Sequence, residues 1–129
     1  MPKMQFVSLT STWFIEPGSE QAAWAAIQEL ASKVEAGEPG TLSYQVFSQF
    51  AGDPRLQSLP PVTPNTVVFE ETYASAEAFL EHVNGPIFTT FVEEHGALFV
   101  QSNGKPYTTV QFLTHQAGFS RQAPVDAAD

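Results

Sequence analysis

The sequence predicts an α+β fold in which two βαβ units build one four-stranded antiparallel sheet with both helices on the same face. Two observations support this prediction. The hydrophobic period changes along the chain between two, which is typical of strands, and about 3.6, which is typical of helices. The order strand, helix, strand also occurs twice. With 129 residues, the chain is long enough to form one domain around one core.

The first unit is predicted within residues 5–50. Residues 5–15 alternate between the two sides of a strand, and one side holds Val7, Leu9, Trp13 and Ile15. Glu16-Pro17-Gly18 predicts a turn, after which Ser19 is the expected N-cap of a helix that ends near Gly37. Residues 41–50 alternate again and predict the second strand, of which one side holds Leu42, Tyr44, Val46 and Phe50.

The second unit is predicted from residue 66 onward. Residues 51–64 contain four prolines and predict a long loop. Residues 66–73 are rich in β-branched and aromatic side chains and predict the third strand. Ser75 is expected to cap a helix that Asn84-Gly85-Pro86 interrupts, and residues 107–113 predict the fourth strand. Residues 1–115 are therefore interpreted as a single domain and residues 116–129 as a polar tail.

The composition excludes several classes of function. Five basic and fourteen acidic side chains give a formal charge of −9, which would repel nucleic acid. Cysteine is absent, so disulfides, thiolate metal sites and thiol nucleophiles are excluded. The histidines have no ligand spacing, and we expect no metal site. No segment is apolar enough for a signal peptide or a membrane span, so the expected location is cytoplasmic, without a membrane partner.

One face of the predicted sheet is unusually apolar for a surface. The side chains expected to point away from the helices include Phe6, Phe14, Phe47, Val68, Val110 and Phe112. At roughly 25 cal/mol per Å² of buried apolar surface, covering such a face yields on the order of ten kcal/mol before association costs. This favours a homodimer with the sheets packed face to face. The alternative is that the register of a strand differs by one residue, which would mix the faces.

Three motifs, FIEPGSE, EPGTLSYQVF and VVFEETYASAEAFLEHVNGPIFTTF, resemble those of the antibiotic biosynthesis monooxygenase family. The resemblance extends from residue 4 to about residue 113. It implies a ferredoxin-like subunit, a dimeric α/β barrel and a pocket between sheet and helices. Catalytic members oxidise electron-rich aromatic molecules such as quinols or anthrones with molecular oxygen, usually without metal or flavin. The resemblance therefore implies a small aromatic substrate and no cofactor.

The resemblance also assigns residues. His82 matches the histidine of the family's second helix, and Tyr73 takes the place of tryptophan in a Glu-x-Trp motif. Ile87 stands where quinol oxygenases often have a second histidine, so one candidate base is missing. The haem-degrading members differ at the positions of Val92, Tyr73 and Ser11, so haem degradation is not expected.

The sequence offers His82 and Tyr73 as catalytic residues. Histidine has an unperturbed pKa of about 6.5 and can accept a phenolic proton near neutral pH. A structural role is the alternative, with the imidazole bonded to a loop carbonyl. The expected substrate-binding residues are Trp13, Tyr44, Phe79, Asn84, Phe88 and Phe91, although the aromatic ones could equally be core. Glu70 and Glu71 are expected to be solvated charges.

Two functions remain open at this stage. The first is a cofactor-independent monooxygenase acting on a quinol, an anthrone or a similar aromatic molecule. The second is a non-catalytic dimeric module that binds a small hydrophobic or aromatic metabolite. Ile87 and Tyr73, which replace a histidine and a tryptophan of the family pattern, favour the second function.

Overall fold

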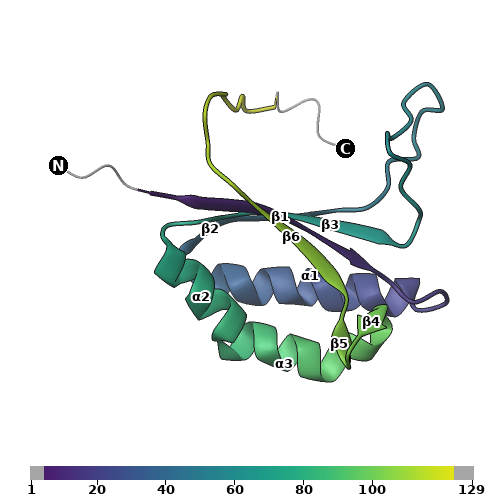
Figure 1. Cartoon of the computed structure of the whole chain (residues 1–129), viewed down its shortest axis with the longest axis horizontal. Helices are drawn as coiled ribbons and strands as arrows, with labels where there is room; N and C mark the ends of the chain where they lie inside the picture. Colours follow the sequence, from purple (N-terminus) through teal and green to yellow (C-terminus); the bar gives the residue numbers. More distant parts are fainter. Residues whose placement is uncertain (1–4, 124–129) are drawn as a thin grey trace.

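Residues 5–123, which the computed structural model describes, form a four-stranded antiparallel sheet with helices on one face (Figure 1). The strand order is β2-β3-β1-β6. The strands are β1 at Val7–Phe14, β2 at Thr41–Phe47, β3 at Thr66–Tyr73 and β6 at Thr108–Leu113. The helices are α1 at Glu20–Gly37, α2 at Ala76–Asn84 and α3 at Pro86–His95. The predicted order of two βαβ units and the ferredoxin-like fold are confirmed.

The hydrophobic periodicity does not predict the short elements between α3 and β6, because each of them has only two or three residues. A 3₁₀ turn, η1 at Gly96–Leu98, follows α3, and a small hairpin pairs β4 at Gln101–Ser102 with β5 at Lys105–Pro106. Asn103 and Gly104 both have positive φ angles, of 55° and 78°, as a tight hairpin turn requires. Within residues 5–123, no helix is both long and apolar enough to cross a membrane.

The break between α2 and α3 lies at Gly85, as predicted. Gly85 has an extended backbone with φ −82° and ψ 167°, and Pro86 begins α3, where the missing N–H has no partner to lose. A Cβ atom at position 85 would collide with the carbonyl oxygen of Glu81. Glycine therefore allows the two helices to follow each other with only one residue between them.

The two serine caps differ. The Ser75 hydroxyl accepts a hydrogen bond from the Ala78 N–H at 3.1 Å, which confirms that cap. Ser19 occupies the N-cap position of α1, but its side chain makes no capping bond, so that prediction is wrong in its mechanism. The Glu20 carboxylate instead accepts the Gly18 N–H at 2.8 Å and so holds the preceding turn.

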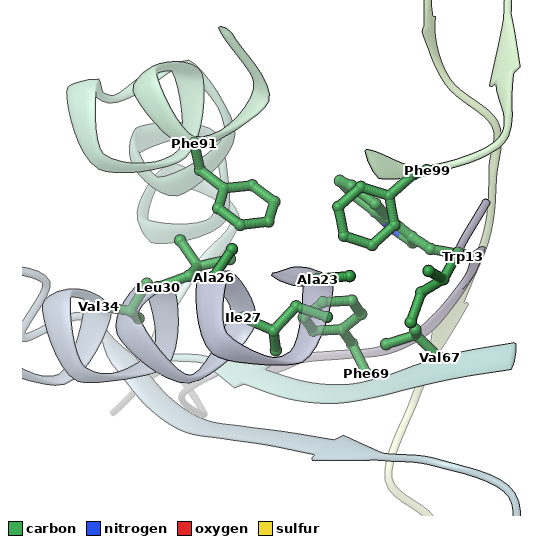
Figure 2. Close-up of a cluster of buried hydrophobic side chains, with 11 residues drawn as sticks. Trp13, Ala23, Ala26, Ile27, Leu30, Val34, Val67, Phe69, Phe91 and Phe99 are labelled. Atoms are coloured by element: carbon green, nitrogen blue, oxygen red, sulfur yellow. The ribbon is translucent and has the colours of Figure 1, made fainter. Parts of the chain in front are cut away.

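The core lies between α1, α3 and the sheet (Figure 2). Its buried members are Trp13, Ile15, Ala23, Ala26, Ile27, Leu30, Val34, Val67, Phe69, Phe91 and Phe99. Trp13 is central, because its ring lies 5.1 Å from Phe99 and 5.8 Å from Phe69, centroid to centroid. Each fully buried large side chain of this kind contributes about 1.5–3 kcal/mol, so the helices are firmly attached to the sheet.

The second strand differs from its prediction at both ends. The register shifts between Thr41 and Ser43, so Leu42 is the extra residue of a bulge and is 52% exposed. The strand ends at Phe47, and Phe50 is 60% exposed. The alternation of residues 41–50 does not predict the bulge. An extra residue changes which face of the sheet the side chains before it occupy, and it leaves no mark in the composition.

The fourth strand presents the opposite face from the one predicted. Val110 pairs with Ser11 and Phe112 with Leu9, so both lie on the helix side, and Phe112 contacts Phe79 at 5.1 Å between ring centroids. The prediction that they point away from the helices is therefore wrong. Both sets of alternating residues in β6 contain apolar side chains, and only the pairing with β1 decides between them.

The helix-free face, here called the open face, holds Phe14, Phe47 and Val68 of the predicted side chains, together with Tyr107 and Leu113. Phe6 precedes β1 and is 53% exposed. Phe14 and Tyr107 stack at 6.2 Å between centroids. The β2–β3 connector rises on this same side of the sheet in Figure 1, opposite the helices. The backbone of the connector therefore does not lie over the helices.

Candidate functional site

A small cavity of about 80 Å³ lies between the sheet and the α2–α3 pair. Its walls are largely aromatic, from Trp13, Tyr44, Phe69 and Phe88. Its polar lining comes from Ser11, Glu71, His82 and Thr108, and Leu9 and Val110 complete it. Thr108 and Val110 lie exposed on the edge strand β6, so the cavity opens to solvent beside that strand.

The imidazole of His82 is buried and held from one side. His82 is 2% exposed, and its Nδ1 lies 2.7 Å from Oε1 of Glu38. The same oxygen of Glu38 accepts the Thr41 hydroxyl at 3.1 Å. Because a carboxylate accepts, Nδ1 carries the hydrogen, and Nε2 of the neutral ring is left as an acceptor. The carboxylate that follows α1 therefore fixes both the orientation and the tautomer of His82.

Nε2 of His82 has no hydrogen-bond partner among residues 5–123, yet no fully buried side-chain nitrogen or oxygen in that part of the chain lacks a partner. Nε2 must therefore keep some accessible surface, and His82 is one of the residues that line the cavity. The ring is surrounded by Tyr44, Tyr73 and Phe88, with centroids 5.2–5.5 Å away. A proton acceptor is thus placed in an aromatic wall.

Glu71 is the main polar residue that the sequence interpretation missed. It is 8% exposed and accepts a hydrogen bond from the Tyr73 hydroxyl, so the expectation of a solvated charge is wrong. Glu70, its neighbour, is exposed as expected. The period of two that places Val67 and Phe69 toward the helices also places Glu71 there. That signal was available in the sequence.

The ionisation of these groups follows from their burial. Burial raises the pKa of the Glu71 carboxyl, and the hydrogen bond from Tyr73 opposes part of that rise. Burial and the nearby negative charge of Glu71 raise the pKa of the Tyr73 hydroxyl. Burial likewise raises the pKa of the Tyr44 hydroxyl well above its usual range. Both tyrosines therefore remain neutral phenols at physiological pH and cannot serve as bases.

A chain of hydrogen bonds crosses the other end of the cavity. Nε1–H of Trp13 donates to Oγ of Ser11 at 3.1 Å, and Oγ of Ser11 lies 2.9 Å from Oγ1 of Thr108. The Thr108 hydroxyl donates to the carbonyl oxygen of Thr109 at 3.3 Å. Either hydroxyl can be the donor between Ser11 and Thr108, and when all three bonds are made at once, Ser11 donates to Thr108, because each hydroxyl has one hydrogen. The hydroxyls then offer only lone pairs to the cavity.

The structure brings together half of the site residues that the sequence predicted. His82, Trp13, Tyr44 and Phe88 line the cavity. The other four do not line it, for different reasons. Tyr73 is fully buried behind Glu71 and His82, and Phe79 packs between Tyr73 and Phe112. Asn84 is exposed at the end of α2, and Phe91 belongs to the core.

The partners of these residues could not all be found from the sequence. Ser11 lies on the core-facing side of the first strand by the same alternation as Trp13, so its position was predictable. Glu38 lies 44 residues from His82 in the chain, and no local pattern connects them. Within residues 5–123, no group of three or more histidine, cysteine, aspartate or glutamate side chains is placed to hold a metal ion.

Comparison with known proteins is consistent with this arrangement. Residues 6–94 match the family described as Antibiotic biosynthesis monooxygenase. The chain belongs to that family. The match includes Trp13, Glu38, Glu71 and His82, and it ends before β6 begins. No curated protein matches the chain.

Solved structures resemble the fold over most of the chain. A Caulobacter crescentus protein, named as a candidate antibiotic biosynthesis monooxygenase, has a TM-score of 0.68 at 19% identity, over 88% of this chain and 92% of its own. Rv0793 from Mycobacterium tuberculosis has a TM-score of 0.65 at 19% identity, over 89% and 99%. A Bacteroides thetaiotaomicron protein of unknown function has a TM-score of 0.65 at 15% identity, over 88% and 100%. These identities establish the fold alone.

Proposed function

We propose that this member of the antibiotic biosynthesis monooxygenase family is a cofactor-independent monooxygenase that oxidises a quinol, an anthrone or a similar electron-rich aromatic molecule. One observation carries the proposal: Nε2 of a buried imidazole is free to accept a proton in the wall of an aromatic cavity, while Glu38 holds Nδ1 at 2.7 Å. Carboxylate-supported histidine is a common general base.

The reaction can be balanced with oxygen and the substrate alone. His82 takes the hydroxyl proton of the substrate, or of its enol form, and leaves an electron-rich anion. One oxygen atom then forms a carbon–oxygen bond, the O–O bond breaks, and the second oxygen leaves as water. For an anthrone, the ring CH₂ becomes a carbonyl group, and the substrate supplies the four electrons that reduce O₂. Glu38 stabilises the imidazolium formed in the first step.

Tyr73 acts in this proposal through Glu71. Its hydroxyl donates to Glu71 and it has no access to the cavity, so it positions that carboxylate and does not itself transfer a proton. Trp13, Tyr44 and Phe88 provide ring contacts for a flat substrate. Phe79, Asn84 and Phe91, also predicted to bind substrate, lie too far back or outside for contact and are assigned structural roles.

The size of the cavity requires a movement during binding. An apolar cavity of about 150 Å³ can hold benzene, whereas this one has about 80 Å³. Phe88 lies in the first turn of α3, directly after the Gly85-Pro86 break, and is only partly buried. We expect it to turn aside and the substrate to extend toward the opening beside Val110.

The proposed assembly is a homodimer in which the open faces of two sheets pack together. Phe47 and Leu113 are about half exposed on that face, and with Phe14 and Tyr107 they form an apolar surface that suits an interface. In this arrangement the two cavities stay on the helix sides of their own subunits and are independent of the interface.

The test is oxygen uptake with a panel of quinols and hydroxylated polycyclic aromatics. His82→Gln should lower turnover by about 10²–10⁴-fold, the usual contribution of a general base, while thermal unfolding and dimer size remain as in the wild type. His95→Gln is the control, because His95 lies at the end of α3 and outside the cavity. Unchanged turnover in His82→Gln would remove His82 from the mechanism.

The second candidate function is a non-catalytic binding module. The small volume of the cavity and the presence of Ile87 in place of a second histidine favour it. A module of this kind would bind aromatic molecules but show no oxygen uptake with any member of the panel. Its ligand affinity would not require a base at position 82. Binding and oxygen uptake measured with the same compounds separate the two functions.

A further inference from the structure

We propose that the cavity selects uncharged aromatic molecules by their hydrogen-bond donors, at least two hydroxyl or amino groups, and excludes molecules that carry a carboxylate or another anionic group. This inference rests on the proposed function only in taking the cavity as the binding site. It is supported by the hydrogen-bonding state of the polar side chains at the two ends of the cavity.

At the Ser11 end, the hydrogens are already in use. The chain from Trp13 through Ser11 and Thr108 to the Thr109 carbonyl uses the hydrogen of each hydroxyl. What the hydroxyl oxygens retain are lone pairs. A ligand that reaches this end can therefore be recognised by a donor group, and a ligand acceptor there would face another acceptor.

At the His82 end, the available atoms are acceptors except for the hydroxyl of Tyr44. Glu71 receives the Tyr73 hydroxyl and has further lone pairs on its carboxylate. In the neutral ring whose Nδ1–H donates to Glu38, Nε2 of His82 is an acceptor. Both residues line the cavity. The hydroxyl of Tyr44 has no partner among residues 5–123 and is the one lining hydroxyl there with a hydrogen still to give.

The charge of the lining also favours neutral ligands over anionic ones. Glu71 lines the cavity and Glu38 lies directly behind His82, while no lysine or arginine lines the cavity within the described residues. The chain as a whole carries a formal charge of −9. An anionic ligand would lose its hydration and gain no cationic partner, which is strongly unfavourable in a buried site. Neutral ligands avoid both costs.

The spacing of the two ends sets the number of donors. Ser11 on β1 is directly opposite Phe69 on β3, and Glu71 is two residues further along β3. Such diagonal neighbours have side-chain origins roughly 7–8 Å apart. A single aromatic ring between them can direct hydroxyl groups from opposite ring positions to the two ends. A ring with two donors is therefore bound better than a ring with one.

The test is equilibrium binding under anaerobic conditions, so that no turnover occurs. Hydroquinone, 4-methylphenol and p-xylene have nearly the same size and carry two, one and no donors. We expect the dissociation constant to rise about tenfold with each lost donor, against the order that hydrophobicity alone would give. We also expect 2,5-dihydroxybenzamide to bind and 2,5-dihydroxybenzoate, its anionic counterpart, to bind at least tenfold more weakly.

A matched pair of variants assigns the effect to the cavity. Glu71→Gln keeps an acceptor for Tyr73 and removes the charge, so the difference between the benzoate and the benzamide should shrink at least fivefold. Glu70→Gln removes the same charge one residue away, on the open face, and should leave that difference unchanged. Thermal unfolding of both variants checks that the fold is intact.

Several outcomes would overturn the inference: p-xylene binding as tightly as hydroquinone, the benzoate binding as tightly as the benzamide, equal effects of the two variants, or no binding by any compound. These outcomes are separate from the proposed oxidation. If the diols bind in the expected order but no compound of the aerobic panel consumes oxygen, the monooxygenase proposal fails and the donor preference stands.

Discussion

Both faces of the sheet carry large apolar side chains, but the surroundings of the two faces are very different. On the helix side most of them are packed into the core, as Phe69 is at only 2% exposed, whereas Val110 and Phe112 on the edge strand β6 are about half exposed. On the open face the aromatic side chains lie toward the ends of the strands, around a middle that contains Thr10, Gln45 and Glu70. The helix-side face therefore forms the core of the subunit, and the open face is the one on which we propose the dimer contact.

The comparison is sharpest at two neighbouring glutamates. Glu70 and Glu71 have the same side chain and adjacent positions on β3, but Glu70 is exposed on the open face whereas Glu71 is buried beside the cavity. The difference comes only from the pleat of the strand, which directs successive side chains to opposite faces. Whether a side chain at such a position is buried or exposed depends on whether its position along the strand is odd or even.

The largest expected effect separates the faces by stability. Phe69→Ala should lower the free energy of unfolding by about 3–5 kcal/mol, because it leaves a cavity beneath Trp13 and Tyr44. Val68→Ala, one residue away on the open face, should cost about 1 kcal/mol or less. Urea denaturation of both variants measures the difference. Equal losses would mean that the two faces are packed alike.

A smaller effect concerns Glu71 and pH. Because burial raises the pKa of its carboxyl above the ordinary value of 4.5, the folded state holds this proton more tightly than the unfolded state does. Wild-type stability should therefore decrease as the pH rises from 4.5 through the raised pKa. Glu71→Gln lacks this loss, so its stability relative to wild type should increase over that interval.

The measurement is a series of urea titrations between pH 4 and pH 8 for wild type, Glu71→Gln and Glu70→Gln. The Glu70 variant should follow the wild type throughout, because its carboxylate is exposed. A Glu71→Gln curve parallel to the wild type would contradict the burial of that charge.

The smallest expected effect on folding is on the open face. Phe47→Ser should change the unfolding free energy of a subunit by no more than about 0.5 kcal/mol, since the side chain is 48% exposed. It should nevertheless raise the dissociation constant of the proposed dimer about tenfold or more. Light scattering over a dilution series measures this, with Gln45→Ser as the control on the same face. A wild-type chain that is monomeric at micromolar concentration would contradict the dimer.

The sequence was sufficient for the order of the elements because their periods and breaks are local properties. Ser75 and Gly85-Pro86 mark helix ends through their own chemistry, and both were placed correctly. The face of β6 was not predictable, because Val110 and Tyr107 are apolar on opposite sides of the strand. Pairing with Ser11 decides that question, and pairing is a property of the whole sheet.

The candidate site shows the same division. His82 and the aromatic rings were found from helix and strand patterns together with the family resemblance. The contact of His82 with Glu38 joins the end of α1 to α2 and depends on how the two βαβ units fit together. The expectation for Glu71 is wrong for a different reason. A charged side chain predicts exposure, whereas the alternation of β3 directs the side chain at position 71 toward the helices.

The strand order has a consequence for how the protein could be divided. β1 lies between β3 and β6, which both come from the second unit, and the cavity takes Trp13 and Tyr44 from one unit and Glu71, His82 and Phe88 from the other. Cleavage in the β2–β3 connector would yield two fragments, neither of which contains a complete sheet or a complete cavity. Ligand binding would return only when the fragments reassociate, which makes this fold suited to a split reporter for proximity.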